Sequence, residues 1–177
     1  MIQKQTDLNE VFEWAIKNEM LEIAKAALKR GADINVDKHI LYWAVFYNNL
    51  ELAKFLVESG FDINANKNTL YETVCSGNLE IAKFLVENGY DINADKYTLY
   101  WAVYNDNLEM AKFLVENGYD INANEDILFQ AVNINNLEIT KFLVENGSNR
   151  EQIEIALRES QRLNKTEFIE YLEGVLK

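Results

Sequence analysis

Hydrophobic and polar positions along the chain recur together every 29 residues. One recurring block is found as MLEIAKAALKRGADIN (20–35), NLELAKFLVESGFDIN (49–64), NLEIAKFLVENGYDIN (78–93), NLEMAKFLVENGYDIN (107–122) and NLEITKFLVENGSN (136–149). A second block lies upstream of each copy, as VFEWAI (11–16), ILYWAV (40–45), TLYETV (69–74), TLYWAV (98–103) and ILFQAV (127–132). A fixed period of this length is the signature of a repeat architecture in which each period contributes two segments.

The downstream segment of each period has the spacing of an amphipathic helix. In one copy, apolar residues stand at i, i+3, i+6 and i+7, at Leu79, Ala82, Leu85 and Val86, with charged residues between them. A glycine follows in the same phase in every copy, at Gly31, Gly60, Gly89, Gly118 and Gly147. We expect these glycines to end the helices in a left-handed conformation that satisfies the last carbonyl groups.

The upstream segment is only about two helical turns long, with an apolar edge such as Leu99, Ala102 and Val103. Isolated helices this short are marginal in water, so each pair has to stack on its neighbours. The pattern predicts an all-α solenoid forming one domain over 1–177, with helix-turn-helix repeats at about 7–35, 36–64, 65–93, 94–122 and 123–151 and a C-terminal cap at 152–177.

Both ends of this stack are expected to be polar, as a soluble solenoid requires. The first repeat begins with TDLNE, and the last repeat has Ser160 and Gln161 where the preceding repeat has Ala131 and Val132.

The run LYWAVYNDNLEMAKFLVENGYDIN (99–122) resembles the ankyrin repeat, whose usual pattern is TPLHxAAxxGHxEVVxLLLxxGADVN. The chain departs from that pattern by lacking proline, by placing an aromatic residue at the usual histidine (Tyr42, Tyr71, Tyr100 and Phe129), and by its shorter period. The resemblance implies a helical solenoid whose β-hairpin fingers are shortened to loops such as ADKY (94–97). We therefore expect almost no strand.

Two in-phase series on the upstream helices differ from copy to copy: Trp14, Trp43, Glu72, Trp101 and Gln130, and Lys17, Phe46, Cys75, Tyr104 and Asn133. The resemblance places them on the concave face, the usual partner-binding surface of ankyrin proteins. The partner-binding residues we predict are Trp14, Trp43, Phe46, Glu72, Trp101, Tyr104, Gln130 and Asn133. Large aromatic side chains on such a face are typical of interface hot spots, but the tryptophans could equally cover neighbouring loops.

Other residues that recur with the same period are interpreted as structural. Lys38, Lys67 and Lys96 add positive charge near the groove, and ordinary solvated loop lysines are the favoured interpretation. Phe61, Tyr90 and Tyr119 are interpreted as packing residues. The loop aspartates Asp33, Asp62, Asp91 and Asp120 faintly resemble the start of a calcium loop, but the glycine and glutamate that such a loop needs are missing, so we expect them to cap the loops.

The composition of the chain limits the classes of molecule that it is expected to bind. The 177 residues include 17 basic and 29 acidic side chains, which give a net charge of −12. This charge disfavours binding to a nucleic-acid backbone and favours binding to a basic protein. No run of 18 apolar residues occurs and the N-terminal residues lack the apolar core of a secretory signal, so we expect a soluble protein that does not enter membranes. Cys75 is the only cysteine, which fits the cytoplasm. A monomer is expected.

Few residues could support catalysis. His39 is the only histidine, Cys75 has no second cysteine for redox chemistry, and no phosphate-binding glycine loop or zinc-binding motif is present. We expect no enzyme activity, no cofactor and no metal. The predicted function is a non-enzymatic protein-interaction scaffold that binds through its concave face. The alternative is an acidic cytosolic inhibitor or immunity protein that masks a basic enzyme or toxin. Self-association through the end repeats is a third possibility, disfavoured because both ends look polar.

Overall fold

The computed structural model describes residues 2–177, with side chains from Asp7 onward. These residues form two compact units, Met1–Asp91 (unit 1) and Ile92–Lys177 (unit 2). Unit 1 contains the helices α1 (Ile2–Lys17), α2 (Leu21–Lys29), α3 (Ile40–Phe46), α4 (Leu50–Glu58), α5 (Thr69–Cys75) and α6 (Leu79–Glu87). Unit 2 contains α7 (Thr98–Tyr104), α8 (Leu108–Glu116), α9 (Ile127–Asn133), α10 (Leu137–Glu145), α11 (Arg150–Arg162) and α12 (Thr166–Leu176).

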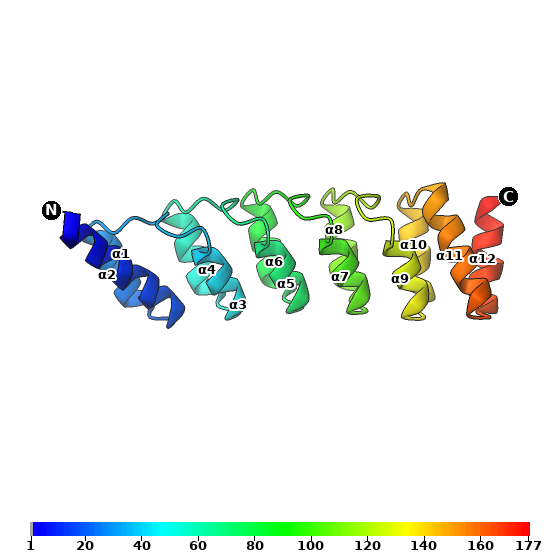
Figure 1. Ribbon diagram of the computed structural model, residues 1–177, viewed down its shortest axis with the longest axis horizontal. Coiled ribbons are helices and arrows are strands. Elements are labelled where there is room, and N and C mark those ends of the chain that lie inside the picture. Colours follow the sequence, from blue (N-terminus) through cyan, green and yellow to red (C-terminus); the bar gives the residue numbers. More distant parts are fainter. Residues whose placement is uncertain (1) are drawn as a thin grey trace. The chain divides into compact units, whose positions relative to one another are not determined.

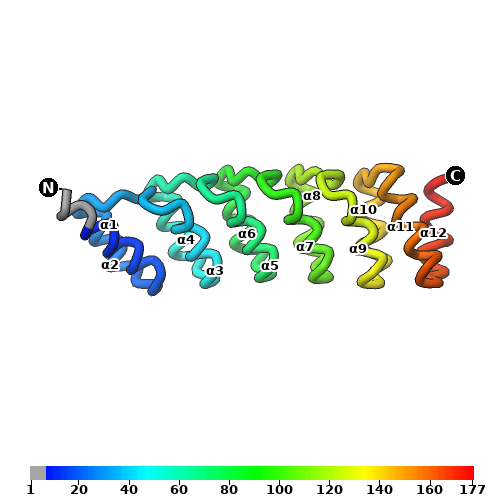
Figure 2. Tube along the Cα trace, in the orientation of Figure 1, coloured from blue at the N-terminus to red at the C-terminus, as the bar shows by residue number. Residues whose placement is uncertain are grey.

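Each unit is a row of antiparallel helix pairs, here called layers (Figure 1). In unit 1 the first helices α1, α3 and α5 contact one another in sequence order, and in unit 2 α7, α9 and α11 do the same. The chain traced in Figure 2 returns between layers through short loops rather than hairpins. Residues 2–177 contain no strand, which confirms the all-helical fold and the shortened fingers.

The core of each layer is wider than the sequence pattern suggested. In α6 the buried residues are Ile81, Ala82 and Leu85, whereas Leu79 and Val86 are only half-buried. The predicted amphipathic helix is present, and its buried face is centred on Ile81, Ala82 and Leu85, with Leu79 and Val86 at the margins. The helix α6 is covered by its own partner helix α5 and by α4 of the preceding layer, so a broader arc of its surface is buried than one stripe.

The recurring glycines end the second helices as predicted. Gly89 has φ of +90°, and its N–H donates to the carbonyl of Val86 at 3.1 Å. The N–H of Tyr90 reaches back to the carbonyl of Leu85 at 3.0 Å, which completes a Schellman motif. The other in-phase glycines share this backbone, with φ from +92° to +110° at Gly31, Gly60, Gly118 and Gly147.

The first helices end in a second left-handed series that the sequence analysis did not anticipate. It recurs with the same period at Glu19, Asn48, Gly77, Asp106, Asn135 and Asn164, all with φ between +54° and +71°. Asparagine and aspartate tolerate this conformation better than other residues with a side chain. Each repeat thus contains a left-handed turn after its first helix and another after its second helix. Glycine recurs regularly only in the turn after the second helix.

Asparagine side chains connect successive layers. The amide of Asn64 donates to the carbonyl of Gly89 at 3.0 Å and accepts from the N–H of Asp91 at 2.7 Å. Asn122 makes the equivalent pair of bonds with Gly147 and Asn149. The amide matches one carbonyl and one N–H of the next loop, so it fastens that loop in both directions.

Aspartate and asparagine side chains also cap the loops and helices locally. The carboxylates of Asp33, Asp62 and Asp120 accept the N–H group two residues ahead, which confirms their predicted capping role. At the start of each regular second helix an asparagine side chain accepts the N–H three residues ahead, at Asn49, Asn78, Asn107 and Asn136.

The two ends of the chain differ from the expectation that both are polar. In the last layer Gln161 is exposed, but Ser160 is buried and its hydroxyl donates to the carbonyl of Ala156 at 2.8 Å. In the first layer Val11 and Ile23 are 43% and 39% exposed. The expectation was wrong for this end, because two apolar side chains are exposed on the helices of the first layer.

Replacing Gly89 with alanine tests the helix-stop geometry. A Cβ at Gly89 would meet no atom within 4 Å, so the cost comes from the backbone conformation alone, about 1–2 kcal/mol of unfolding free energy. The matched control is Gly174→Ala within α12, which also has open space around it and should stabilise the chain by about 0.5–1 kcal/mol. Urea unfolding followed by circular dichroism measures both, and equal effects of the two substitutions would contradict this account.

Asn122→Ala tests the fastening between layers. It removes both inter-layer bonds of the amide and should lower the unfolding free energy by about 1–2 kcal/mol, while Asn122→Asp keeps the acceptor and should cost less. Asn146→Ala is the control, because its amide bonds only to Phe142 within its own helix, and a change below about 0.5 kcal/mol is expected. Chemical denaturation of the variants side by side measures the difference, and a loss for Asn146→Ala as large as for Asn122→Ala would refute the fastening role.

Candidate binding surface

The first helices of both units carry the residues that vary between layers. We define the first-helix face as the exposed side of α1, α3 and α5 in unit 1 and of α7, α9 and α11 in unit 2, and consider each unit by itself. Each first helix buries one edge, such as Leu99, Ala102 and Val103 in α7. The opposite edge is left free to carry side chains that the packing does not require.

In unit 1 this face is aromatic. Trp14 and Phe46 are 50% and 51% exposed, and Trp43, which follows Trp14 in its series, is half-buried. The Trp43 ring meets Phe46 edge-on at 5.9 Å between centroids and stacks on Tyr47 at 6.1 Å. Tyr42 stacks on Phe46 at 6.1 Å. The rings of α3 and Tyr47 thus support one another and hold Phe46 in an exposed position.

Charged groups flank this aromatic cluster. The half-buried Glu72 of α5 accepts a hydrogen bond from the Tyr42 hydroxyl at 3.3 Å. Burial and the Glu72 carboxylate together raise the pKa of that hydroxyl, which therefore stays protonated. On the other side of the cluster, the Lys17 ammonium lies 5.9 Å from the centre of the Trp43 ring.

Cys75 is half-buried, and burial raises the pKa of its thiol, so it is not an activated nucleophile.

Unit 2 has a second aromatic group on α7. Tyr104 is 51% exposed and lies 5.1 Å from the half-buried Trp101, while Tyr100 contacts both. Gln130 is buried, and its side-chain oxygen accepts a hydrogen bond from the Tyr100 hydroxyl at 3.4 Å. Asn133 is exposed. The amide groups of α9 make this side of the cluster neutral, in contrast to the Glu72 side of the unit 1 cluster.

The next position in the series beyond Gln130 is Glu159, on α11. Its buried carboxylate accepts two hydrogen bonds from the guanidinium of Arg162, at 2.7 and 2.6 Å. These bonds lower the pKa of Glu159, so the carboxylate remains ionised.

The structure therefore places the predicted residues in three environments. Trp14, Phe46, Tyr104 and Asn133 are exposed, Trp43, Glu72 and Trp101 are half-buried, and Gln130 is buried. Two further aromatic side chains are exposed at the ends of α3 and α7, Tyr47 at 37% and Tyr97 at 47%, and neither is among the predicted residues. Both stand at positions that vary between repeats, so the comparison of copies that singled out Phe46 could have found them.

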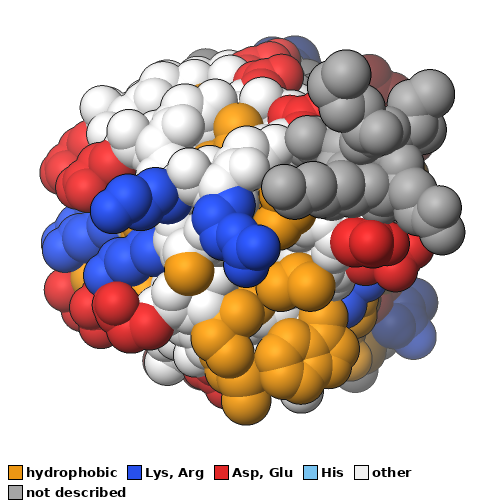
Figure 3. Space-filling model, turned by 90° about the vertical axis from the view of Figure 1, so that its left-hand side faces the viewer, with side chains coloured by type: hydrophobic (Ala, Val, Ile, Leu, Met, Phe, Trp, Pro, Cys, Tyr) orange, Lys and Arg blue, Asp and Glu red, His pale blue; other side chains and the backbone are white. Residues whose placement is uncertain are grey.

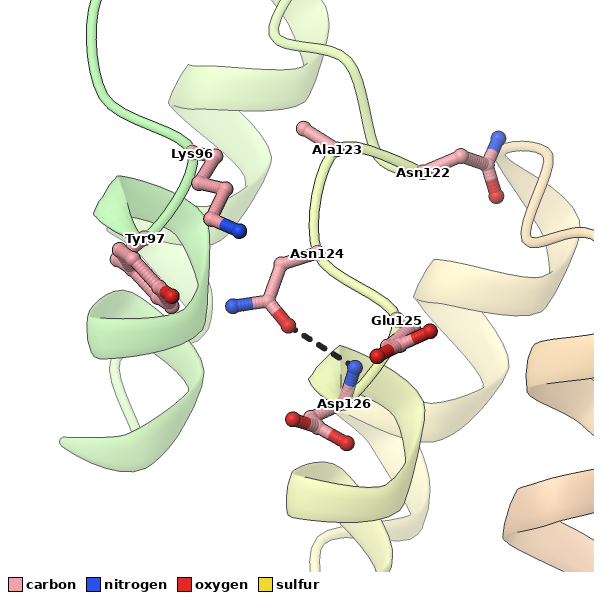
Figure 4. A pocket seen from close by; sticks show the side chains of 7 residues that line it. All are labelled: Lys96, Tyr97, Asn122, Ala123, Asn124, Glu125 and Asp126. Atoms are coloured by element: carbon pink, nitrogen blue, oxygen red, sulfur yellow. Dashed lines mark hydrogen bonds between the residues drawn. The ribbon is translucent and has the colours of Figure 1, made fainter.

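The loops beside the first helices carry the in-phase lysines. Lys38, Lys67 and Lys96 are exposed, and the Lys96 ammonium lies 5.0 Å from the centre of the Tyr97 ring. Lys96 and Tyr97 from one loop and residues 122–126 from the next line a shallow hollow of about 300 Å³ (Figure 4). In the second loop the side chain of Asn124 accepts the N–H of Asp126 at 2.9 Å, which fixes the wall of the hollow.

Buried tyrosines hold these loops in place. The Tyr119 hydroxyl donates to the carbonyl of Asp95 at 3.0 Å, and Tyr90 does the same for Asn66 at 3.1 Å. Both side chains, together with Phe61, are at most 5% exposed, which confirms the packing role. Burial raises the pKa of Tyr119 to about 12.

The side chains described, from Asp7 onward, form no group of three or more His, Cys, Asp or Glu residues that could hold a metal ion. Within the same residues, no helix is both long and apolar enough to cross a membrane. The single imidazole, His39, lies in a loop with its Nδ1 at 2.9 Å from a carboxylate oxygen of Asp37.

Comparison with known protein families identifies ankyrin repeats in this chain. The model for ankyrin repeats in three copies matches residues 12–96, 41–125 and 99–173. The matched segments overlap and together span residues 12–173, which include α3, α5, α7, α9 and α11 and the last six residues of α1. No curated protein sequence matches the chain significantly.

Alkaline titration tests the tyrosine that supports the Lys96 loop. Because the pKa of Tyr119 is about 12 in the folded protein against 10.0 for a free phenol, its contribution to stability is complete below pH 10.0 and is lost as the pH rises through about 12. Tyr119→Phe should cost about 1 kcal/mol at neutral pH through the lost hydrogen bond to Asp95 and should flatten the loss of stability across that window.

Denaturant unfolding at a series of pH values measures this effect, with Tyr97→Phe, an exposed tyrosine, as the control that should leave both quantities nearly unchanged. Equal pH dependence of the wild type and Tyr119→Phe would show that Tyr119 is not the group involved.

Proposed function

The chain belongs to the ankyrin-repeat family, whose repeats generally serve as protein–protein interaction modules, and we propose that it is a non-enzymatic scaffold that binds another protein through its first-helix face. The observation that carries the proposal is the pair of aromatic clusters around Phe46 and Tyr104. Each cluster exposes about half of a large ring on a helix whose other side is fully packed.

Preorganised rings are suited to binding. Aromatic side chains supply a large contact area, and residues already held by neighbours lose little freedom when a partner covers them. In unit 1, Trp43 and Tyr42 restrict Phe46, and in unit 2, Trp101 and Tyr100 restrict Tyr104. Trp14, Glu72 and Asn133 extend the proposed contact area, and Gln130 supports it from below through Tyr100.

The partner we propose is a basic protein. The net charge of −12 would steer such a partner toward the chain, and the half-buried Glu72 beside exposed rings offers a carboxylate and π faces to a lysine or arginine side chain. The same charge supports a second candidate function, an acidic inhibitor or immunity protein that covers a basic enzyme or toxin. A cytoplasmic setting accompanies both, supported by the single half-buried Cys75.

Substitution of one exposed ring per unit tests the proposal. Phe46→Ser and Tyr104→Ser remove rings that are 51% exposed, so the fold should be retained. The wild-type chain is used to capture its partner from the organism of origin, and the purified partner is then titrated against each variant by calorimetry. We expect each substitution to weaken binding by a factor of about 10–100, as for interface hot spots.

Val175→Ser is the matched control, because Val175 is 41% exposed but lies on the second helix α12, outside the helices that carry the first-helix face, and it should bind as the wild type does. Full affinity in both aromatic variants would refute binding through this face. Association that does not slow with added salt would leave the scaffold proposal intact and refute the basic partner and the inhibitor role.

A further inference from the structure

In the first layer of unit 1, two apolar positions that are buried in the later repeats are exposed. Val11 corresponds to Ile40, Thr69, Thr98 and Ile127 in later repeats, and all four of these are at most 1% exposed. Ile23 corresponds to Leu52, Ile81, Met110 and Ile139, which are likewise at most 1% exposed. In the first layer the same positions are 43% and 39% exposed. Figure 3, which views unit 1 from this end, shows hydrophobic side chains gathered beside Lys and Arg side chains.

The geometry points to a second copy of this chain as the occupant of that surface. We infer a symmetric pair in which the first layers meet face to face, with α1 of each copy lying over α2 of the other. A two-fold arrangement uses the same patch on both subunits, so the patch has to complement itself. Its apolar centre, Val11 and Ile23, meets that requirement directly.

Charge on the two helices also fits this arrangement. Asp7 lies one turn before Val11 on α1, and Arg30 lies two turns after Ile23 at the end of α2, and both are exposed. Because α1 and α2 are antiparallel, Asp7 and Arg30 stand at similar heights, each about 15 Å along its helix from the connecting turn. Placing α1 over α2 of the partner copy therefore brings Asp7 of one copy toward Arg30 of the other, twice in the pair.

The net charge of the first layer is close to zero, which also favours self-association. Residues 1–35 contain five basic and six acidic side chains, so this part of an acidic chain repels a second copy only weakly. The last layer is a poorer match, because its Gln161 replaces the buried Val132 of the preceding layer and is exposed. A polar residue at that position disfavours head-to-tail stacking of the first layer of one copy on the last layer of another.

Sedimentation equilibrium of the full chain across micromolar to millimolar concentrations tests the inference. The wild type should rise from the 20.5 kDa of one chain toward twice that mass and no further. Ile23→Lys places a charge at the centre of the contact and should remain at the mass of one chain. Val175→Lys, at a residue of similar exposure on α12, should pair as the wild type does. Circular dichroism confirms that both variants are folded.

Charge reversal tests the proposed orientation. Asp7→Arg alone and Arg30→Asp alone should each weaken pairing at least about tenfold, since each creates two like-charge contacts, and the double variant should regain it. A wild type that stays at the mass of one chain throughout would overturn the inference. Loss of association in Val175→Lys but not in Ile23→Lys would also overturn it, because the chains would then pair through their last layers. Growth beyond two chains would overturn it as well, because it would indicate head-to-tail stacking.

Discussion

Every helix pair in this protein depends on its neighbours, because no helix of a regular repeat is long enough to be stable alone. The first helices have seven residues and the second helices nine, both below the length at which an isolated helix persists in water. The loops also bind across layers, since one asparagine amide pairs with both a carbonyl and an N–H of the next loop. Within each unit, burial and hydrogen bonding thus act between the same adjacent layers, and each layer stabilises the next.

This dependence divides the residues of a repeat into two kinds. Positions that contact another layer are held to small or apolar residues, as at Ala44, Ala102 and Ala131, all fully buried. Positions on the outer edge of the first helix carry no such requirement, and they vary from Trp43 to Glu72 within unit 1. A surface with variable chemistry can therefore exist on a constant framework, which is the physical basis for proposing recognition there.

The period made most of the fold predictable from the sequence, and the failures arose where environment rather than residue type decides. Gly89 could be identified as a helix stop because glycine is the residue that accepts a left-handed backbone without strain. The equivalent turn after the first helices was missed because Asn48 and Asp106 adopt it, and those residues are equally common in other turns.

The sequence predicted which positions form the candidate surface, but it did not predict how exposed each side chain is. Comparing repeats identified Phe46 and Tyr104, which are exposed, and also Gln130, which is buried beneath Tyr100. The side chain of Gln130 accepts a hydrogen bond from Tyr100 of the preceding layer, and a pattern along one chain does not show such a contact. The exposed Val11 was missed for a similar reason, since its residue type matches the buried positions of later layers and only the missing neighbour distinguishes it.

The two proposed surfaces can operate together in one assembly. In a pair with α1 of each copy over α2 of the other, the two-fold axis runs along the helices, so the first-helix faces of the two copies lie on opposite sides. Each copy could then bind a partner without obstructing its neighbour. Trp14 stands at the junction, since it lies in series with Trp43 and one turn from Val11 on α1. Pairing would restrict the surroundings of Trp14 before any partner arrives, and a preorganised anchor binds at a smaller entropic cost. Self-association and partner binding would in that case favour each other, because a partner that contacts Trp14 gains affinity for the paired form and, by linkage, stabilises it.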